Sequence, residues 1–262
     1  MHTQKHQSPQ GAKINAGLLV SFIFAAATLG LSACNSDRNP LPIGDLRVAN
    51  AISDSNPIDA TVVSIPSGID NIAFGSGSGF KDVVEGSYRV QLTTTTSSGQ
   101  VTINADSTPI DKGQATTVYA TGQLSLGTQA TFVVETMENT IASDKSEVQF
   151  VNVASQQSAP LDIYVTAPGA TLVGAVPTTT LSFPANNQPA LFAPGAYEIR
   201  VTAQGNPVTV LFDSGPLGVP FAAISSQQFA LLDNTNVAFP SPLSLMILTG
   251  SGGSALIQNG GS

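Results

Sequence analysis

The sequence predicts an all-β protein with two tandem immunoglobulin-like antiparallel β-sandwiches that follow a cleaved export signal. Three observations support this fold class. Beyond residue 45 the chain consists of short alternating or apolar runs. Turn-forming residues separate these runs about every ten residues, a spacing typical of sandwiches and barrels. The runs of the first half recur in the same order in the second half. No stretch after residue 34 shows sustained helical periodicity.

The predicted strands are rich in Thr and Val, which favour pleated, half-buried positions. Residues 46–50 (LRVAN) and 88–93 (YRVQLT) alternate between apolar and polar side chains, so we expect one face of each strand to be buried. Shorter runs of similar composition predict the remaining strands, and they lie at 101–103, 116–119, 131–134 and 243–248.

An internal repeat relates the two halves of the chain. The matched segments are 46–51 with 148–153, 57–62 with 160–165, and 86–93 with 195–202. The offset between them rises from 102 to 103 and then 109, and it returns to 107 at Asp106 and Asp213. This drift indicates loops of different length between matched strands. The match weakens where 116–122 is compared with 220–226, because the second copy lacks the tyrosine and the closing glycine.

The repeat predicts where the domains begin and end. We expect one sandwich over residues 45–143 and a second over 144–250, since the charged segment SDKSE interrupts the apolar pattern at 143–147. Residues 251–262 are rich in Gly and Ser and are expected to form a flexible tail.

The N-terminus has the features of an export signal. Lys5 and Lys13 precede an apolar segment over 16–31, which is short for a membrane span of about 20 residues. The segment ends in LSAC at 31–34, which resembles the lipobox of bacterial lipoproteins. The resemblance implies a signal peptide over 1–33, cleavage between Ala33 and Cys34, and acylation of Cys34 with diacylglycerol and an N-linked chain such as palmitate. Three acyl chains would anchor the protein firmly in a membrane.

The residues that follow Cys34 predict a tether and the membrane in which the protein is anchored. Residues 34–44 are polar with two prolines and read as a short tether. In lipoproteins of Gram-negative bacteria, an Asp directly after the acylated cysteine favours retention in the inner membrane, and this chain has Asn35 at that position. The resemblance therefore implies an outer-membrane location, on either the periplasmic face or the cell-surface face.

Composition after cleavage excludes several function classes. The mature chain keeps 7 Lys and Arg against 17 Asp and Glu, a net charge of −10 that argues against nucleic-acid binding. Both histidines, His2 and His6, lie in the signal peptide, and the only cysteine is Cys34. The mature chain thus lacks the groups for a Ser-His-Asp or Cys-His site and for a His/Cys metal or haem site. We expect no cofactor, no metal and no catalytic residues.

The repeated motifs resemble the bacterial domain family of unknown function DUF4397. The resemblance covers residues 45–250 and rests on three elements that recur in both halves: a strand ending in Asn, a Pro-x-Asp strand start, and Gly-x-Tyr before a strand. It implies tandem β-sandwiches in an exported protein, often a lipoprotein, and it brings no established activity.

Eight recurrent residues are expected to serve the structure. Gly86 and Gly195 are expected to supply turns with positive φ. Tyr88 and Tyr197 are expected to pack their rings and hydrogen-bond a loop, as in a tyrosine corner. The remaining four are expected to cap turns or bind backbone amides, and they are Asn50, Asn152, Asp59 and Asp162.

Three functional interpretations stay open at the level of sequence. The first is a non-catalytic, membrane-anchored binding or scaffolding module of the cell envelope, with an envelope protein or a polysaccharide as partner. The second is a surface adhesin or carbohydrate-binding module that uses the loop of the second copy at 178–189. The third is a carboxylate-dependent hydrolase, although no pair of acids is marked by the sequence. Loosely grouped acids, Asp54, Asp59, Asp70, Asp82 and Glu85, lack a calcium-loop pattern and are expected to be solvated.

Overall fold

The computed structural model describes residues 41–262 apart from 66–67, 138–139, 235–237, 239–240 and 261–262. The described residues belong to one compact unit, and all their regular elements are strands. No helix in this part of the chain is long and apolar enough to cross a membrane. The signal peptide, Ala33, Cys34 and the tether up to residue 40 lie outside the described residues, so these features remain predictions.

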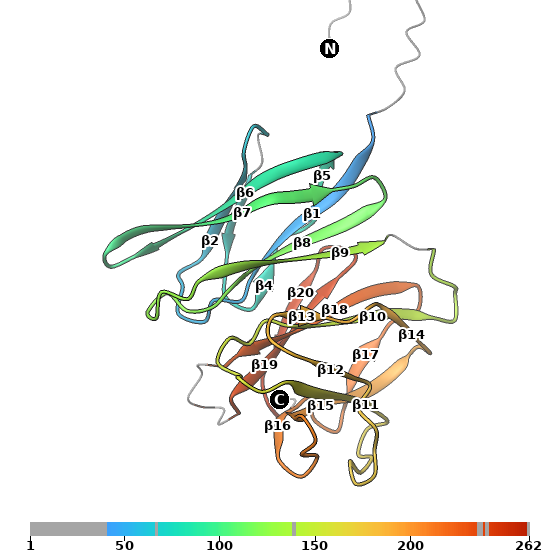
Figure 1. Cartoon of the computed structure of the whole chain (residues 1–262). Helices are drawn as coiled ribbons and strands as arrows, with labels where there is room; N and C mark the ends of the chain where they lie inside the picture. The colour runs from blue at the N-terminus through green and yellow to red at the C-terminus, as the bar shows by residue number, and fades with distance from the viewer. Residues whose placement is uncertain (1–40, 66–67, 138–139, 235–237, 239–240, 261–262) are drawn as a thin grey trace, which may run out of the picture. The chain divides into compact units, whose positions relative to one another are not determined.

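The first sandwich consists of β1–β9 (Figure 1). Sheet A has the order β4-β1-β8-β9, with β5 also paired to β1, and sheet B has the order β3-β2-β6-β7. The strands are β1 (Ile43–Asn50), β2 (Ile58–Val62), β3 (Ile69–Ile72), β4 (Ser76–Gly77), β5 (Lys81–Val84), β6 (Gly86–Thr96), β7 (Gly99–Ile110), β8 (Gln114–Thr121) and β9 (Ala130–Met137).

The second sandwich consists of β10–β20. Sheet C has the order β13-β10-β18-β19-β20 with β14 on β10, and sheet D has the order β12-β11-β15-β16 with β17 on β15. The strands are β10 (Ser146–Asn152), β11 (Leu161–Thr166), β12 (Thr179–Leu181), β13 (Ala185–Asn186), β14 (Ala190–Phe192), β15 (Gly195–Ala203), β16 (Val210–Asp213), β17 (Val219–Phe221), β18 (Ser225–Asp233), β19 (Leu243–Thr249) and β20 (Ser254–Ile257).

The prediction of an all-β protein built from sandwiches is confirmed. Strands β10–β19 follow the order of β1–β9, with β16 and β17 together in the place of β7. One feature departs from a purely antiparallel fold: β1 pairs in parallel with β8, and β10 pairs in parallel with β18. A parallel pair requires a long crossover connection, and the strands of the opposite sheet provide it.

Two expectations from the sequence are wrong. The counterpart of β8 is β18 rather than 220–226. Thr117 of β8 lies opposite Arg47 of β1, and Gln228 of β18 lies opposite Gln149, the residue of β10 that matches Arg47. Tyr119 therefore corresponds to Ala230. The expected flexible tail over 251–262 instead contains β20, which extends sheet C through four residue pairs with β19. Leu256 of this strand lies against Gly75 of the first sandwich, where a Cβ would come within 2.7 Å of its side chain.

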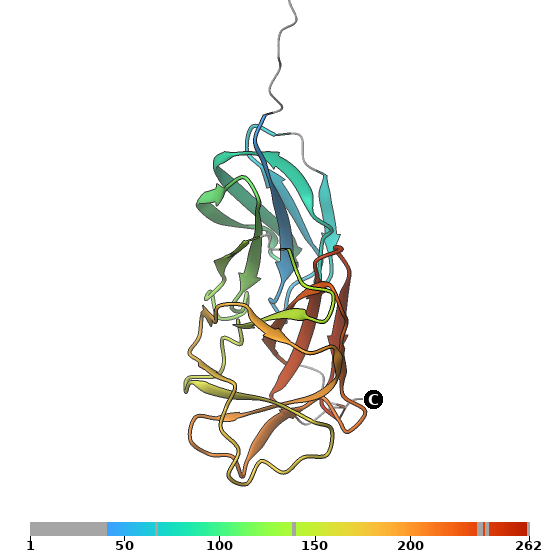
Figure 2. The ribbon, with the colours of Figure 1, turned by 90° about the vertical axis from the view of Figure 1, so that its right-hand side faces the viewer.

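The four sheets stack in the order B, A, C, D, and three apolar layers lie between them (Figure 1). Leu46 and Val48 of β1 face sheet B, while Ala49 faces sheet C. Figure 2 shows β19 and β20 alongside the first sandwich. The middle layer joins Tyr119 and Val134 of sheet A to side chains of sheet C, which are Val151, Val153, Ala230, Leu232, Met246 and Leu248.

Because sheets A and C are covered on both faces, their strands do not show the burial pattern of an ordinary sandwich. All seven residues of β10 are buried, whereas β2 of sheet B alternates between buried and exposed positions. Continuous burial is typical of strands inside a layered protein, and alternation is typical of a sheet with one solvated face.

A buried polar cluster lies in the middle layer, centred on the carboxamide of Gln228. Its Oε1 accepts hydrogen bonds from Arg47 Nη2 at 2.6 Å, Thr117 Oγ1 at 3.1 Å and Tyr119 Oη at 3.1 Å. Its Nε2 donates to Thr136 Oγ1 at 3.1 Å and to Gln149 Oε1 at 2.8 Å. Since arginine can only donate, its contact fixes the orientation of the amide.

Arg47 completes this cluster with two further hydrogen bonds. Its Nε donates to Thr117 Oγ1 at 2.9 Å and its Nη1 to the carbonyl of Thr249 at 2.9 Å. The residue is only 3% exposed. One side chain of the first sandwich thus bonds both a side chain and the backbone of the second. Buried polar groups that are all satisfied specify a single arrangement of the surfaces that they join.

We expect Arg47→Ala to lower the free energy of unfolding by about 3 kcal/mol or more, because it leaves a buried cavity and removes the hydrogen bonds to Thr117, Gln228 and Thr249. Arg89→Ala is the matched control. Within the described part of the chain the Arg89 side chain bonds only Asp106, and both side chains are more than half exposed, so the loss should stay within about 0.5 kcal/mol. Urea unfolding of the mature chain carrying Cys34→Ala measures both values, and equal losses would contradict the assigned role of Arg47.

Candidate functional site

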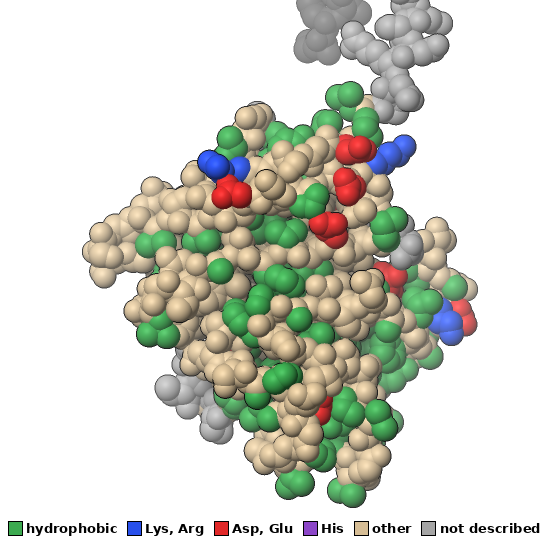
Figure 3. Space-filling view, viewed as in Figure 1, with side chains coloured by type: hydrophobic (Ala, Val, Ile, Leu, Met, Phe, Trp, Pro, Cys, Tyr) green, Lys and Arg blue, Asp and Glu red, His purple; other side chains and the backbone are tan. Residues whose placement is uncertain are grey.

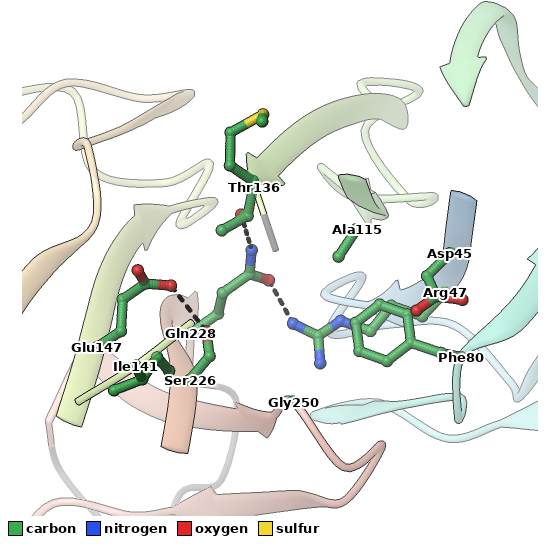
Figure 4. Close-up of a pocket in the computed structure, with 11 residues that line it drawn as sticks. Asp45, Arg47, Phe80, Ala115, Thr136, Ile141, Glu147, Ser226, Gln228 and Gly250 are labelled. Atoms are coloured by element: carbon green, nitrogen blue, oxygen red, sulfur yellow. Dashed lines mark hydrogen bonds between the residues drawn. The ribbon is translucent and has the colours of Figure 1, made fainter. Parts of the chain in front are cut away.

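A pocket of about 170 Å³ opens at one edge of the middle layer, beside Arg47 (Figure 4). Phe80 lies over the guanidinium group, with 4.6 Å between Arg47 Cζ and the ring centroid. Asp45 lines the pocket from β1 and Glu147 from the corresponding position of β10, where Glu147 Oε1 accepts a hydrogen bond from Ser226 at 3.3 Å.

Burial controls the ionisation of the groups around this pocket. Desolvation lowers the pKa of Arg47 to about 10, an effect that the negative charge of a Tyr119 phenolate would oppose. Desolvation raises the pKa of Tyr119 well above its usual range, and the charge of Arg47 opposes that shift. At neutral pH Arg47 is therefore a cation and Tyr119 a neutral donor, which are the states that the hydrogen bonds to Gln228 require.

The pocket beside Arg47 has the properties of an interface between two sandwiches rather than of a ligand site. Ligand pockets usually enclose about 300–1,000 Å³, and this one is smaller. Each guanidinium nitrogen of Arg47 already donates to a protein acceptor. We therefore assign these contacts to holding the two sandwiches together.

A larger cleft of about 460 Å³ lies on the outer face of sheet D. One wall is residues 171–174 of the β11–β12 connection, and the other is Pro207, Val208 and Val210 of the β15–β16 hairpin. Val173 is 86% exposed and Val208 is 88% exposed. Figure 3 shows hydrophobic side chains at the end of the second sandwich where these connections lie. The cleft offers an unusually apolar surface for a solvent-facing site.

The β11–β12 connection forms this cleft because it is longer than its counterpart. Residues 63–68 connect β2 to β3, whereas residues 167–178 connect β11 to β12, which is twice the length. The rise in the repeat offset from 103 to 109 corresponds to these six additional residues. That rise was the available sequence signal for the cleft, whereas the composition of 178–189 predicted the longer loop there.

An ion pair at the floor of the cleft fixes the longer connection. Glu198 Oε1 lies 3.6 Å from Arg200 Nε, and both side chains are at most 10% exposed. Glu198 Oε2 accepts a hydrogen bond from the amide of Gly169 at 2.5 Å, and Arg200 Nη2 donates to Thr166 Oγ1 at 2.8 Å. Two buried opposite charges need such additional hydrogen bonds to offset their desolvation. The floor of the cleft is consequently held in place while its walls stay exposed.

Residues 178–189 do not form the free loop expected for an adhesin. They contain β12 and β13, which pair with β11 and β10. Asn187 binds the backbone of Phe150 on both sides, through Oδ1 at 2.6 Å and through its amide at 3.1 Å. Its carbonyl also accepts a hydrogen bond from Gln149 at 3.0 Å. This segment therefore forms edge strands of both sheets of the second sandwich, β12 in sheet D and β13 in sheet C.

The two recurrent asparagines occupy equivalent, fully buried positions at the ends of β1 and β10. Asn50 Oδ1 accepts a hydrogen bond from Ile52 N at 3.0 Å, and its Nδ2 donates to the carbonyl of Ile72 at 3.1 Å. Asn152 Oδ1 accepts from Ala154 N at 3.1 Å, and its Nδ2 donates to Leu181 at 3.2 Å. Each side chain closes a turn and also fixes the end of a short strand in the other sheet of its sandwich.

The recurrent aspartates both accept hydrogen bonds from the neighbouring edge strand, β3 in the first copy and β12 in the second. Asp59 Oδ1 accepts a hydrogen bond from the amide of Asn71 at 2.7 Å. Asp162 accepts from Thr180 Oγ1 at 2.5 Å and from the amide of Gly205 at 2.7 Å. Neither carboxylate lines the cleft.

The recurrent glycines serve a different purpose from the one expected. Neither Gly86 nor Gly195 has positive φ. Gly86 instead leaves room for the tyrosine two residues on, because a Cβ there would lie 3.1 Å from the Tyr88 ring. At Gly195 a Cβ would lie 3.7 Å from the Tyr197 ring, which is an ordinary van der Waals contact. Side chains at i and i+2 share one face of a strand, which explains the contact. The tyrosine hydroxyls donate to the carbonyls four residues earlier, those of Val84 at 2.8 Å and Ala193 at 3.0 Å.

Other acids likewise bind loop amides. Asp54 accepts from the amides of Leu124 at 2.9 Å and Ser125 at 2.8 Å. Partial burial acts to raise the pKa of Asp54, and these hydrogen bonds outweigh it, so the pKa is lowered. Burial raises the pKa of Asp233, although Ser155 and Gln156 donate to it. Within the described ranges no three His, Cys, Asp or Glu side chains are grouped to hold a metal ion.

Comparisons with known proteins identify a family and similar solved structures. Residues 44–164 match the profile of the family described as a domain of unknown function, DUF4397. The match includes all of β1–β9 except the first residue, and continues through β10 into β11. No curated protein matches the chain.

One of these structures is the crystal structure of a protein from Bacteroides ovatus ATCC 8483 described as "a putative cell adhesion protein". It is 10% identical, the alignment covers 81% of this chain and 96% of that chain, and the TM-score is 0.24. A TM-score of this size does not establish a common fold. The family match agrees with the motifs read from the sequence, and we conclude that the chain carries a DUF4397 domain over residues 44–164.

Proposed function

We propose that the protein is a non-catalytic binding or scaffolding module of the cell envelope, held at the outer membrane through acylated Cys34. The observation that carries the binding role is the apolar cleft on sheet D. Its walls are exposed valines and a proline, and its floor is fixed by the Glu198–Arg200 pair. A rigid floor between exposed apolar walls lowers the entropy cost of binding a partner.

The chemistry of the cleft favours a protein partner over a polysaccharide. Sugar-binding surfaces commonly use aromatic platforms, whereas the side chains that line this cleft are aliphatic, with Thr171 and Arg200 as the polar groups. Apolar contact at the centre of a surface with a polar rim is the usual composition of a protein–protein interface. We therefore propose an envelope protein that presents an apolar segment as the partner.

The lipid anchor is tested by replacing the modified residue. We expect Cys34→Ala to leave the protein unprocessed or released from the membrane, since no acyl chain can be attached to Ala. Fractionation of cells and the mass of the N-terminal peptide measure this, with the wild-type chain as the membrane-bound control. A variant that fractionates with the membrane like the wild type would contradict the anchor.

The cleft is tested by placing a photo-crosslinking amino acid at Val208 in living cells. We expect a discrete protein adduct that weakens at least about tenfold when Val173→Asp is added, because a charge in an apolar contact disfavours binding by more than about 1.4 kcal/mol. The matched control is the same crosslinker at Leu126, which is 69% exposed and belongs to the first sandwich. Equal adducts at both positions, or adducts insensitive to Val173→Asp, would contradict the proposal.

A further inference from the structure

A second apolar patch lies where the described chain begins, and it is separate from the cleft. Leu41 is 68% exposed, Ile43 is 48% exposed and Val84 is 38% exposed. Ile43 and Val84 are direct partners in the antiparallel pairing of β1 with β5. Leu41 precedes Ile43 by two residues, which places the two on one side of an extended chain. The three side chains form one contiguous patch, and Figure 3 shows hydrophobic side chains at this end of the first sandwich.

The backbone holds the patch in place. The carbonyl of Pro42 accepts a hydrogen bond from the amide of Glu85 at 2.9 Å, which joins the start of β1 to the end of β5. The hydroxyl of Tyr88 donates to the carbonyl of Val84 at 2.8 Å. Both flanks of the patch are thus fixed by hydrogen bonds, so its exposure is a property of the folded protein.

The distance along the chain to Cys34 limits where this patch can be. Leu41 is the seventh residue after Cys34. A fully extended chain spans at most about 3.3–3.6 Å per residue, so Leu41, at the start of the patch, lies within about 25 Å of the modified cysteine. An acylated Cys34 sits at the membrane surface. The patch is therefore the part of the described structure nearest in sequence to the lipid.

We propose that Leu41, Ile43 and Val84 rest in the interface of the bilayer that holds the Cys34 anchor. This inference rests on the proposed function, because three side chains alone give weak membrane affinity and need the anchor. The exposed charges that adjoin the patch are mixed in sign, with lysines at 81 and 112 and acids at 82, 85 and 111. A mixed surface of this kind fits a zwitterionic lipid surface better than an anionic one.

The absence of tryptophan from the chain provides a direct test. Ile43→Trp gives a protein with a single tryptophan in the patch, and Val208→Trp gives a matched control in the cleft. Both are prepared as acylated mature protein in vesicles of phosphatidylethanolamine and phosphatidylcholine. We expect blue-shifted emission and quenching by brominated acyl chains for Trp at 43 and neither effect for Trp at 208. Adding Cys34→Ala should remove both effects at position 43.

The outcomes separate this proposal from the anchor itself. Acylation is measured first, by the mass of the Cys34 peptide and by flotation of the protein with the vesicles. If the protein is acylated and floats but Trp at 43 is quenched no more than Trp at 208, the patch does not meet lipid and the proposal is overturned. A blue shift without quenching would assign the patch to a protein contact and also overturn it. Failure of acylation or flotation would overturn the anchor, and this proposal with it.

Discussion

The carboxamide of Gln228 determines how the two halves of the molecule meet. It accepts three hydrogen bonds from the first sandwich and donates one to each sandwich, while its own residue is buried. An apolar layer alone tolerates sliding, because dispersion and desolvation have little directional preference. A polar cluster that must be fully satisfied permits one register, since a displacement would leave several buried groups without partners at once.

This constraint explains why the two copies diverged at corresponding positions. Arg47 and Gln149 occupy the same place in β1 and β10, and Thr117 and Gln228 the same place in β8 and β18. Two arginines facing each other in a dry layer would repel, and two small hydroxyl residues would leave a gap. A long donor opposite an amide that both accepts and donates fills the space and pairs every group.

The sequence allowed prediction of the sandwiches but not of their stacking. The strand pattern, the repeat and the turn spacing were sufficient for the fold because they depend on local alternation. In LRVAN, Arg47 occupies a position that alternation assigns to solvent, and only the presence of the second sandwich buries it. Gly86 and Gly195 were expected to be constrained by φ, yet Gly86 is restricted by the ring of Tyr88 and Gly195 has space for a Cβ. The cleft was not predicted because its signal was a change in loop length, whereas the polar, proline-containing composition of 178–189 indicated a binding loop at that segment.

The pairing of corresponding faces has a consequence for how such repeats can multiply. Sheets A and C meet through the same face of each copy, so the contact is self-complementary in the way of a two-fold interface. Once this contact forms, the face that makes it is buried in both copies and cannot bind a third. A third copy appended to this chain would meet either the outer face of sheet B, whose strands alternate between buried and exposed positions, or the outer face of sheet D, which carries the apolar cleft. A pair is therefore a closed assembly, and longer arrays of this domain would require a different surface between their members.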